Sequence, residues 1–477
     1  MAVTGLLELT PIQQWFFEQN QPEPHHWNQS VLLESKQNID PVILEKTLEF
    51  LQKHHDVLRL RFIQEGFSTQ ALNASPDDII PLTCFNFSEL PKDKQAVAIE
   101  AATIKLQASL NLSQGPLFQV ALFNLGENQA NRLLWIIHHL VVDGVSWRIL
   151  IEDFQTAYQQ ISQGKTIKLP PKTTSYKQWS SCLQKYAQSS ALLSELDFWL
   201  TTQHQSVSPV PIDFSGGNNV EETTSIVSVS LSAEETQSLL QQVPAAYHTQ
   251  INDVLLTALI QTFHQWTGET SLLIDLEGHG REEIFEDVDL SRTVGWFTSI
   301  FPVHLNLENT NELGKALKSI KEQIRAIPNQ GIGYGLLRYL NGDKEISEQF
   351  SLSKAEVLFN YLGQFDRLLP ESSLFSLVQG SSGSTRSLRS KRTHLLEING
   401  GIYQGHLEMS WTYSNQLHRQ TTIEVLAQRF IEALRSLIVH CQSYDAGGFT
   451  PSDFAEFKQS QWDQADLDAI TAAMGDI

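Results

Sequence analysis

Two short apolar strands, each ending in a polar turn that contains glycine, constrain this chain more than any other feature. The first, Leu133–Ile137, runs into His138 and His139, and the second, Ser271–Leu276, runs into the segment EGHG that starts at Glu277. Open α/β sheets bind ligands beyond the carboxyl ends of their strands, so each strand is placed to deliver polar groups to a cleft. The repeated pattern predicts an α/β protein of two similar halves with a cleft between them.

The rest of the chain supports this division. Its 477 residues exceed the usual size of a single core. Residues 165–220 are rich in Pro, Ser, Thr and Gly, and we place a linker at 181–220, between an N-terminal subdomain (1–180) and a C-terminal subdomain (221–477) that ends in an acidic tail. Apolar periodicity predicts further strands at 30–33, 58–62, 117–122 and 224–231, and helices at 41–54, 145–161, 191–200 and 252–267.

Composition is typical of a globular protein that acts on a small molecule or on another protein. Hydrophobic residues make up 41% of the chain and charged residues 18%. The net charge of −21 repels nucleic acid and anionic lipid, so we expect neither nucleic acid nor a membrane as a partner. No apolar stretch is long enough for a membrane span, and the N-terminal residues lack the pattern of a signal peptide, which predicts a cytoplasmic protein.

The pair His138-His139 is the strongest local candidate for chemistry. Neighbouring residues at the end of a strand point to opposite sides, so one histidine can face a cleft while the other packs inside. Histidine is suited to take and return a proton because its unperturbed pKa lies near neutrality. Asp143-Gly144 then opens a predicted helix, with Asp143 placed to cap it. A purely structural role for these histidines is the alternative interpretation.

Other ligand chemistries find little support in the sequence. Adjacent histidines on a strand cannot chelate one metal ion, no third ligand lies at motif spacing, and Cys84, Cys182 and Cys441 are scattered, so we expect no metal and no disulfide framework. The glycines of EGHGRE and NQGIGYGLL match neither a phosphate loop nor a dinucleotide fingerprint, and no G-x-S-x-G elbow is present. We therefore expect neither a nucleotide cofactor nor α/β-hydrolase chemistry.

The segment HHLVVDGVSW (His138–Trp147) matches the HHxxxDG signature of the condensation-domain superfamily of peptide synthetases, which also resembles chloramphenicol acetyltransferase. Further sequence motifs indicate which branch of that superfamily the chain resembles. These are PIQQWFF from Pro11, EGHGRE from Glu277, RTVGWFTSIFP from Arg292, PNQGIGYGLLRYL from Pro328 and FNYLGQFD from Phe359. They follow the family's order and span nearly the whole chain. The chain therefore resembles an epimerization domain of a non-ribosomal peptide synthetase.

This resemblance implies both a fold and an activity. The fold is a V-shaped pseudo-dimer of two acetyltransferase-like subdomains with a central tunnel. The activity is inversion of the α-carbon of an aminoacyl or peptidyl thioester, with His139 and Glu277 as the acid/base pair. Inversion requires removal of a proton from one face of the carbon and delivery of a proton to the other, so one group from each subdomain is a fitting arrangement.

The resemblance also implies partners for the domain. The substrate is carried on the 4'-phosphopantetheine arm of an upstream peptidyl carrier protein, and the domain itself binds no cofactor. A downstream condensation domain receives the product. The chain contains no recognisable carrier serine motif or adenylation signature, so the carrier is expected upstream on a longer polypeptide or on a separate chain. As an excised domain we expect the protein to be a monomer.

Supporting residues follow from the chemistry and from the resemblance. The enolate formed on deprotonation needs hydrogen-bond donors near its oxygen, and the candidates are the helix N-terminus after Asp143 and the side chains of Asn360 and Tyr361. Core packing is the alternative for these two side chains. The resemblance suggests that Asp143 pairs with a buried arginine, for which Arg292 is a candidate. His138 and Gly144 are expected to be structural residues near the site.

A Ser/Gly-rich loop, residues 380–393, carries a basic cluster in an otherwise acidic chain. Its charged members are Arg386, Arg389, Lys391 and Arg392. Such a cluster is usually solvated surface. The functional alternative is a contact for an acidic carrier protein or for the phosphate of its arm.

Two other activities stay open. One is that of a condensation domain, which forms peptide bonds, and the other is that of a catalytically silent module that docks carriers. EGHGRE and NQGIGYGLL favour epimerization over condensation, and the presence of both His139 and Glu277 argues against a silent module.

Overall fold

The fold was analysed in a computed structural model of the chain. It describes residues 3–66, 68–76, 80–126, 129–203, 205, 207–307, 312–350, 354–364, 373–378, 382–444, 446–454, 464, 466–467 and 469. Three predicted features fall partly outside these residues: most of the acidic tail, the end of the FNYLGQFD block and the first two residues of the basic loop. Among the described helices, none has the length and apolar character needed to cross a membrane.

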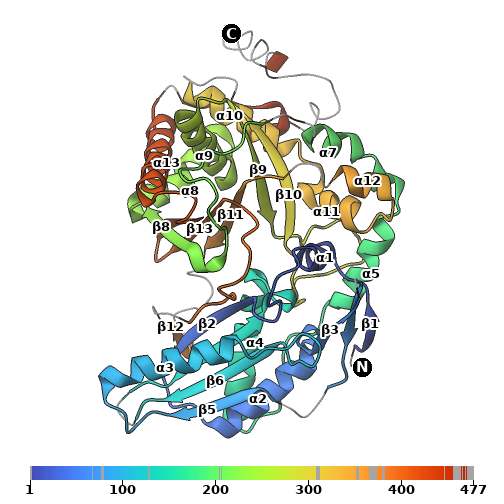
Figure 1. Ribbon diagram of the computed structural model, residues 1–477, viewed down its shortest axis with the longest axis vertical. Coiled ribbons are helices and arrows are strands. Elements are labelled where there is room, and N and C mark those ends of the chain that lie inside the picture. Colours follow the sequence, from blue (N-terminus) through green and yellow to red (C-terminus); the bar gives the residue numbers. More distant parts are fainter. Residues whose placement is uncertain are drawn as a thin grey trace.

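The N-terminal lobe is built on a sheet in which the described strands follow the order β12-β2-β7-β6-β5, where β12 is Phe375–Leu377. Its own strands are β2 (Asn28–Ser35), β5 (Leu82–Asn86), β6 (Phe118–Asn124) and β7 (Arg132–His138). The helices are α2 (Pro41–His54), α3 (Lys92–Gln107) and α4 (Gly144–Ser162). Helices α2 and α4 pack against each other, and β7 is central in the sheet and almost wholly buried. A small sheet of β1 (Gly5–Leu7), β4 (Ser68–Asn73) and β3 (Leu60–Glu65) lies at one end (Figure 1).

The C-terminal lobe contains the larger sheet, in the order β10-β9-β11-β13-β14-β8 within the described residues. Its strands are β8 (Thr224–Ser230), β9 (Ser271–Gly278), β10 (Ser299–Asn306), β11 (Val357–Gln364), β13 (Leu396–Tyr403) and β14 (His406–Ser414). Helices α8 (Ala233–Tyr247), α9 (Ile251–Thr267), α10 (Leu313–Arg325) and α13 (Gln420–Cys441) pack on one side of it.

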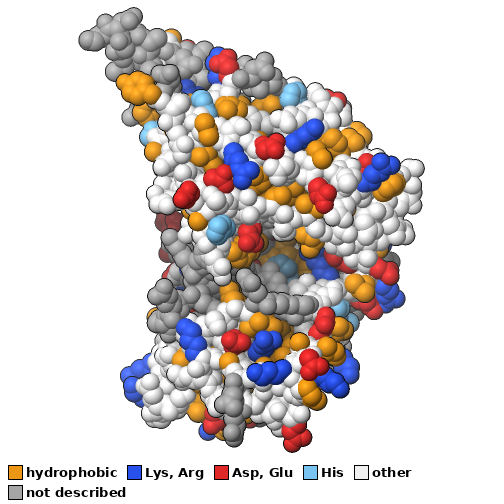
Figure 2. Space-filling view, turned by 90° about the vertical axis from the view of Figure 1, so that its left-hand side faces the viewer, with side chains coloured by type: hydrophobic (Ala, Val, Ile, Leu, Met, Phe, Trp, Pro, Cys, Tyr) orange, Lys and Arg blue, Asp and Glu red, His pale blue; other side chains and the backbone are white. Residues whose placement is uncertain are grey.

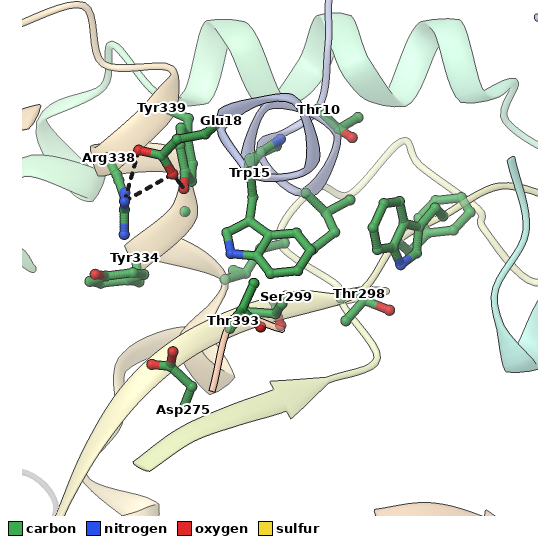
Figure 3. Close-up of a pocket in the computed structure, with 18 of the residues that line it drawn as sticks. Thr10, Trp15, Glu18, Asp275, Thr298, Ser299, Tyr334, Arg338, Tyr339 and Thr393 are labelled. Atoms are coloured by element: carbon green, nitrogen blue, oxygen red, sulfur yellow. Dashed lines mark hydrogen bonds and ion pairs between the residues drawn. The ribbon is translucent and has the colours of Figure 1, made fainter. Parts of the chain in front are cut away.

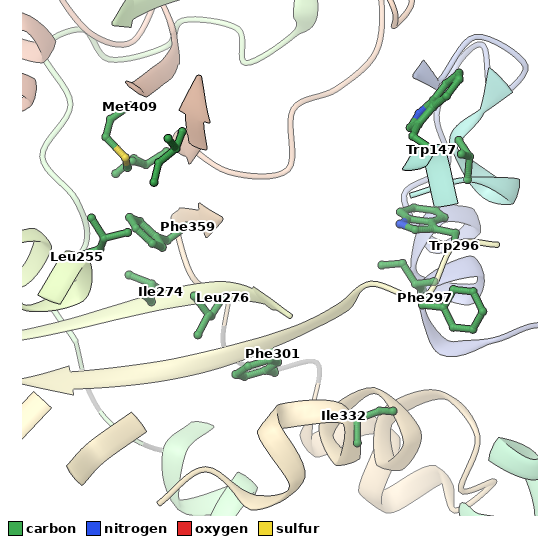
Figure 4. Packing of buried hydrophobic residues seen from close by; sticks show 14 of the residues in the cluster. Trp147, Leu255, Ile274, Leu276, Trp296, Phe297, Phe301, Ile332, Phe359 and Met409 are labelled. Carbon is green, nitrogen blue, oxygen red and sulfur yellow. The ribbon is translucent and has the colours of Figure 1, made fainter. Parts of the chain in front are cut away.

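One face of the large sheet is apolar and the other is polar, because side chains alternate along each strand. Ile274, Leu276 and Phe359 share the apolar face with Met409 and meet Leu255 of α9 (Figure 4). The intervening residues of β9 and β11 therefore point to the opposite face, which no layer of long helices covers in Figure 1.

Three groups of residues join the two lobes. Helix α1 (Pro11–Glu18) lies between them and packs on α11 (Ile332–Tyr339) (Figure 1). Helices α5 (Tyr176–Tyr186), α6 (Ser190–Leu193) and α7 (Leu196–Gln203) lead from one lobe to the other. Strand β12 (Phe375–Leu377), although it comes late in the chain, pairs antiparallel with β2 and completes the N-terminal sheet. The chain therefore returns from the C-terminal lobe to the N-terminal sheet at β12. The subdomain boundaries predicted at 180 and 220 stay a prediction.

Most predicted elements are present with small changes of boundary. The helix expected at 41–54 is α2, with Asp40 accepting the N–H groups of Val42 and Ile43 as its N-cap. The strand expected at 58–62 is wrong in its first half, where a 3₁₀ turn (Asp56–Arg59) precedes β3. The helix expected at 191–200 is split into α6 and α7. Strand β9 runs on to Gly278, so Glu277 lies on the strand itself.

The crossing strand offers a test of how firmly the lobes are joined. Phe375 is 1% exposed and packs on Phe154 of α4, whereas Leu377 on the same strand is 47% exposed. We expect Phe375→Ala to lower the free energy of unfolding by ~3–5 kcal/mol, because it leaves a cavity in the core. The control Leu377→Ala should stay within about 0.5 kcal/mol of wild type in the same denaturant titrations. Equal effects of the two changes would show that β12 is not anchored through Phe375.

Candidate active site

The HHLVVDG segment forms a tight connection between β7 and α4. His138 ends β7 and is fully buried, with Nε2 2.8 Å from the carbonyl oxygen of Pro24 and Nδ1 accepting the N–H of Leu140 at 3.2 Å. Both ring nitrogens are therefore used inside the fold. Burial lowers the pKa of His138 to about 3, which keeps its ring neutral. The structure gives His138 the packing and hydrogen-bonding position expected from the sequence.

A chain of hydrogen bonds determines which nitrogen of His139 carries a proton. The indole N–H of Trp147 can only donate, and it donates to Oε1 of Gln29 at 2.8 Å. The Nε2 amide of Gln29 is then a donor, and it lies 3.0 Å from Nε2 of His139. Nδ1 of His139 lies 2.8 Å from the carbonyl oxygen of Val142, which can only accept. His139 is therefore neutral, with its proton on Nδ1 and a lone pair on Nε2.

The surroundings of His139 favour this neutral form. Burial lowers its pKa to about 4; the hydrogen bond to Val142 acts in the opposite direction, and the positive charge of Arg386 lowers the pKa further. The ring also packs against Trp296, with ring centroids 4.3 Å apart and planes inclined by 32°. Near neutral pH the side chain is a base whose lone pair is on Nε2, where it accepts the hydrogen bond of Gln29.

Asp143 caps α4 and connects it to the other lobe. Its Oδ1 accepts the N–H of Ser146 at 2.7 Å, and its Oδ2 accepts the N–H of Phe297 at 3.1 Å. Nη2 of Arg281 lies 3.3 Å from Oδ1, and both side chains of this ion pair are almost buried. Arg281 also stacks over the ring of Phe297 at 3.8 Å. The Asp143 carboxylate therefore occupies the N-terminus of α4, so the anion bound at that end of the helix is a side chain of the protein itself.

The prediction that Arg292 pairs with Asp143 is wrong. Arg292 instead binds two acidic residues further along α4, Glu152 at 2.8 Å and Asp153. It still links the two lobes, since Glu152 and Asp153 lie on α4; Asp153 also pairs with His55 at 3.0 Å. Arg281 is closer to Asp143 because it follows β9 in the same turn that holds the glycine of EGHG.

The three groups His54, His55 and Asp153 are the set of described side chains close enough to share a metal ion, with ligand atoms within 4.8 Å of one another. The carboxylate oxygens of Asp153 are, however, bound by His55 and by the guanidinium of Arg292. A cation in that position would compete with a positive charge that is already there. The arrangement fits a structural network.

Gly144 begins α4 with an ordinary backbone conformation. No described atom lies within 4 Å of the position that a Cβ would take. Local packing in the protein therefore does not require glycine, and the residue leaves open space beside the helix start.

Glu277 lies on the polar face of the large sheet. Strand register places Asp275 opposite Leu358, so by alternation Glu277 shares its face with Asn360. The amide Nδ2 of Asn360 donates to Oε2 of Glu277 at 2.7 Å. The structure therefore brings Asn360 to the carboxyl group of Glu277, which leaves Oε1 to carry or accept a proton.

Burial raises the pKa of Glu277 to about 7. The positive charge of Arg386 lowers this pKa and the negative charge of Glu397 raises it. Near neutral pH a large fraction of Glu277 is protonated, so it can act as an acid. With His139 as a neutral base, the two residues form a complementary pair, one able to take a proton and the other able to give one.

Tyr361 does not join this group. It follows Asn360 directly on β11, so its side chain points to the opposite, apolar face together with Phe359. Burial raises the pKa of the Tyr361 hydroxyl to about 12. Of the two side chains proposed as donors to an enolate, the structure places only Asn360 beside Glu277.

The basic cluster is divided between the interior and the surface. The side chain of Arg392 is fully buried, 3.2 Å from Glu397, so it cannot contact a carrier protein. Arg386 points inward, toward Glu221 and the ring of Trp27. The prediction of a carrier contact is therefore wrong for Arg392, whereas for Arg386, whose side chain is 31% exposed, it stays a prediction. Arg389, which pairs with Glu23, and Lys391 are exposed, and for them the contact stays a prediction.

A cavity of about 240 Å³ adjoins this site, between α1, β9, β10 and α11. Figure 3 shows Trp15 of α1 pointing into it, with the ion pair of Glu18 and Arg338 at one end and Asp275 at the other. Trp296, the residue that stacks on His139, also lines it. The surface is hollowed at the waist between the lobes, with histidine and basic side chains at the opening (Figure 2). His139 and Glu277 do not line this cavity themselves; it is bordered by Trp296, which packs on His139, and by Ile300, which pairs with Glu277 between β9 and β10.

Sequence reasoning missed two residues of this site and misplaced a third. Gln29 had no local signal, because a glutamine near a strand end is unremarkable without its partners. Arg281 stands in EGHGRE itself, four residues after Glu277, and that proximity was a signal that Arg292 lacked. Arg386 was seen only as part of a charged loop.

This two-lobed α/β architecture is the chloramphenicol acetyltransferase-like fold of the condensation superfamily. It superposes on the crystal structure of the epimerization domain from the third module of tyrocidine synthetase B with a TM-score of 0.87, at 37% identity, covering 92% of this chain and 98% of that chain. The first condensation domain of the calcium-dependent antibiotic synthetase shares the fold at a TM-score of 0.68 and 16% identity, covering 92% of this chain and 98% of that one.

Residues 3–458 match the family described as Condensation domain, and the chain belongs to this family. It is 48% identical over 465 residues to a linear gramicidin synthase protein of Brevibacillus parabrevis, covering 96% of this chain and 6% of that protein. It is 38% identical to gramicidin S synthase 1 of Brevibacillus brevis, covering 97% of this chain and 43% of that protein. The chain thus spans less than half the length of these relatives. The predicted fold class and the resemblance inferred from the motifs are confirmed.

The first prediction from the site concerns the partner of Asp143. We expect Asp143→Ala and Arg281→Met each to lower the free energy of unfolding by ~1 kcal/mol or more, because each leaves a nearly buried charge without its partner. In a double-mutant cycle the two changes should be coupled by ~1 kcal/mol or more. The matched pair Asp143→Ala and Arg292→Met should be additive within about 0.5 kcal/mol. Coupling of Asp143 to Arg292 alone would restore the original assignment.

The second concerns the tautomer of His139. In Gln29→Glu a carboxylate replaces the amide that donates to Nε2, and it stabilises the protonated ring by accepting a hydrogen bond from Nε2–H. We expect the pKa of His139 to rise by about 1 or more in an NMR titration of labelled histidines, with His139→Ala providing the assignment. Gln119→Glu is the control, since it adds the same charge to β6 at a side chain that donates to Thr83. An unchanged pKa of His139 in folded Gln29→Glu would show that the hydrogen bond from Gln29 does not determine the tautomer of His139.

Proposed function

We propose that this domain epimerizes the α-carbon of an aminoacyl or peptidyl group that is held as a thioester on the 4'-phosphopantetheine arm of a peptidyl carrier protein. The observation that carries the proposal is the complementary protonation of His139 and Glu277, one from each lobe. Amide bond formation needs at most one general base, whereas inversion needs a base on one side of the carbon and an acid on the other. The similarity to the tyrocidine epimerization domain supports the same conclusion.

The reaction follows from the proton positions. In one direction, the hydrogen bond from Gln29 to Nε2 of His139 breaks and Nε2 removes the α-proton, and the electron pair of the broken C–H bond moves to the thioester oxygen as an enolate. The protonated carboxyl group of Glu277 then delivers its proton to the opposite face of the same carbon. In the reverse direction Glu277 as carboxylate is the base and protonated His139 is the acid. Each turnover moves one proton between the two residues, and exchange with solvent resets them.

The remaining residues of the site have supporting roles in this scheme. Asn360 binds one oxygen of Glu277 and orients the carboxyl group, so that the other oxygen faces the substrate. Gln29 and Val142 hold the ring of His139 in the tautomer that the base requires. Asp143 and Arg281 keep the two lobes in register and do not touch the reacting atoms. The domain works with an upstream carrier and a downstream condensation domain, and no cofactor of its own takes part.

The test starts from both epimers. A carrier protein loaded with an L-aminoacyl thioester and the same carrier loaded with the D-epimer should converge on one mixture, because a catalyst does not change the equilibrium. The two epimers differ little in free energy, and a tenfold bias would need about 1.4 kcal/mol. In deuterated water the α-position should gain deuterium, measured by intact mass and chiral analysis. Dipeptide formation with an added acceptor aminoacyl carrier would instead establish condensation.

The same assay measures the two catalytic residues. His139→Ala and Glu277→Gln should each lower the rate by ~10²–10⁴-fold, as expected for loss of a general acid or base, while the melting curve barely moves. Glu397→Gln is unsuitable as a control because Glu397 is buried with Arg392, so Glu408→Gln, at an exposed residue of the neighbouring strand β14, serves instead. Wild-type turnover in a folded variant would remove that residue from the mechanism.

A further inference from the structure

Arg386 is held against the lobe that carries His139. The backbone of Arg386 forms an isolated antiparallel β-bridge with Trp27, and the guanidinium lies over the Trp27 ring, 4.1 Å from the ring centroid. The carbonyl oxygen of Trp27 accepts the backbone N–H of His139 at 2.9 Å. Arg386 is thereby fixed on the residue that holds the backbone of His139.

The same guanidinium also reaches the polar face of the C-terminal sheet. Nη1 donates to Oε1 of Glu221 at 3.0 Å and lies 3.8 Å from Oε2 of Glu397. In the ladder of β11 and β13, Glu397 is paired with Leu358, which is itself paired with Asp275 of β9. Paired residues of adjacent strands share a face, so Glu397 is on the face that carries Glu277. Arg386 therefore contacts neighbours of both candidate catalytic residues.

Arg386 also keeps hydrogen-bonding capacity. A guanidinium has several N–H donors in a planar fork, and among the described residues only Nη1 has a hydrogen-bond partner. The side chain is 31% exposed, in contrast to the fully buried Arg392, which shares Glu397 with it. The donors of Arg392 are directed to Asn219, Glu397 and Thr412. The Nε of Arg392 has no partner but is fully buried, so of the two arginines that share Glu397, Arg386 is the one whose remaining donors a ligand can reach.

We propose that Arg386 is a catalytic residue that binds the enolate oxygen through its unused N–H groups. This inference rests on the proposed epimerization. When His139 takes the α-proton, the electron pair of the C–H bond becomes negative charge on the thioester oxygen, and a fixed cation there stabilises the charge as it develops. Arg386 donates hydrogen bonds and gives up no proton, since guanidinium stays protonated. The charge disappears when Glu277 returns a proton to the carbon.

The electrostatic environment agrees with this position. Arg386 contributes to lowering the pKa of both His139 and Glu277, as a cation between them must. The other titratable groups that act on His139 and Glu277 include Asp143, Glu397, Asp275 and His394, together with the neighbouring ring of His138. Most of these groups are themselves paired: Asp143 with Arg281, Asp275 with His394, and Glu397 with Arg392. Arg386 is itself paired with Glu221, but among the groups named here it is the cation whose charge acts on both His139 and Glu277.

The experiment compares Arg386→Met with Arg386→Lys in the epimerization assay, using the carrier-loaded L-aminoacyl thioester that the wild-type chain converts fastest. Arg386→Met should lower kcat by ~10²–10³-fold, as expected for loss of a donor to an oxyanion, with a KM close to wild type. Arg386→Lys keeps the charge without the fork and should retain more activity than Arg386→Met. Added guanidinium ion at millimolar concentration should partly restore Arg386→Met and leave wild type unaffected.

Arg435→Met is the matched control, because Arg435 makes an equivalent ion pair with Glu235 on the outer helices, 2.7 Å apart. It should leave kcat unchanged. If wild type epimerizes but folded Arg386→Met keeps a kcat within about threefold of it, the role of Arg386 is disproved and the proposed function stands. If wild type itself neither epimerizes nor incorporates deuterium, the proposed function fails first. Should Arg386→Met unfold, a kcat of folded Arg386→Lys equal to wild type, with no effect of added guanidinium, would overturn the proposal.

Discussion

The ion pair between Asp143 and Arg281 is the constraint on which the site depends. Asp143 follows His139 by four residues, and Arg281 follows Glu277 by four residues, so one contact across the lobes positions both candidate catalytic groups. The carboxylate also caps α4 and binds the N–H of Phe297, which fixes the segment that carries Trp296 against the His139 ring. Removing a buried charge partner is costly, so this contact resists separation of the lobes.

Local patterns predicted the elements of the fold well because their causes are local. Helix α2 begins after Asp40, which caps it, and its apolar residues recur at helical spacing, so its limits follow from the sequence. Strand β7 is a run of apolar residues and is buried on both faces. The crossing of β12 into the N-terminal sheet has no such signal. Its partner strand β2 lies more than 300 residues earlier in the chain, and three residues are too few to show a pattern.

The site was predictable in its chemistry and less so in its contacts. The histidine pair, Glu277 and Asn360 were found from motifs, but the partner of Asp143 depends on which arginine the folded lobes bring near it. Alternation along a strand, which assigned the two histidines to different sides, applies equally to Asn360 and Tyr361 and places them on opposite faces. The basic loop was misread for a different reason. Glu221 and Glu23, which bind Arg386 and Arg389, lie more than 150 residues away in the chain, so the sequence cannot distinguish an inward charge from a solvated one.

A cation between His139 and Glu277 suits a reaction that must run in both directions. The two resting states of the pair differ by the transfer of one proton from Glu277 to His139. Arg386 disfavours the protonated histidine and favours the ionised glutamate, so its effects on the two residues oppose each other and the balance between the resting states changes little. Charge on the substrate has no such compensation. A hydrogen-bonded guanidinium therefore stabilises the enolate without favouring either epimer, which is the condition under which one site can invert a stereocentre from either side.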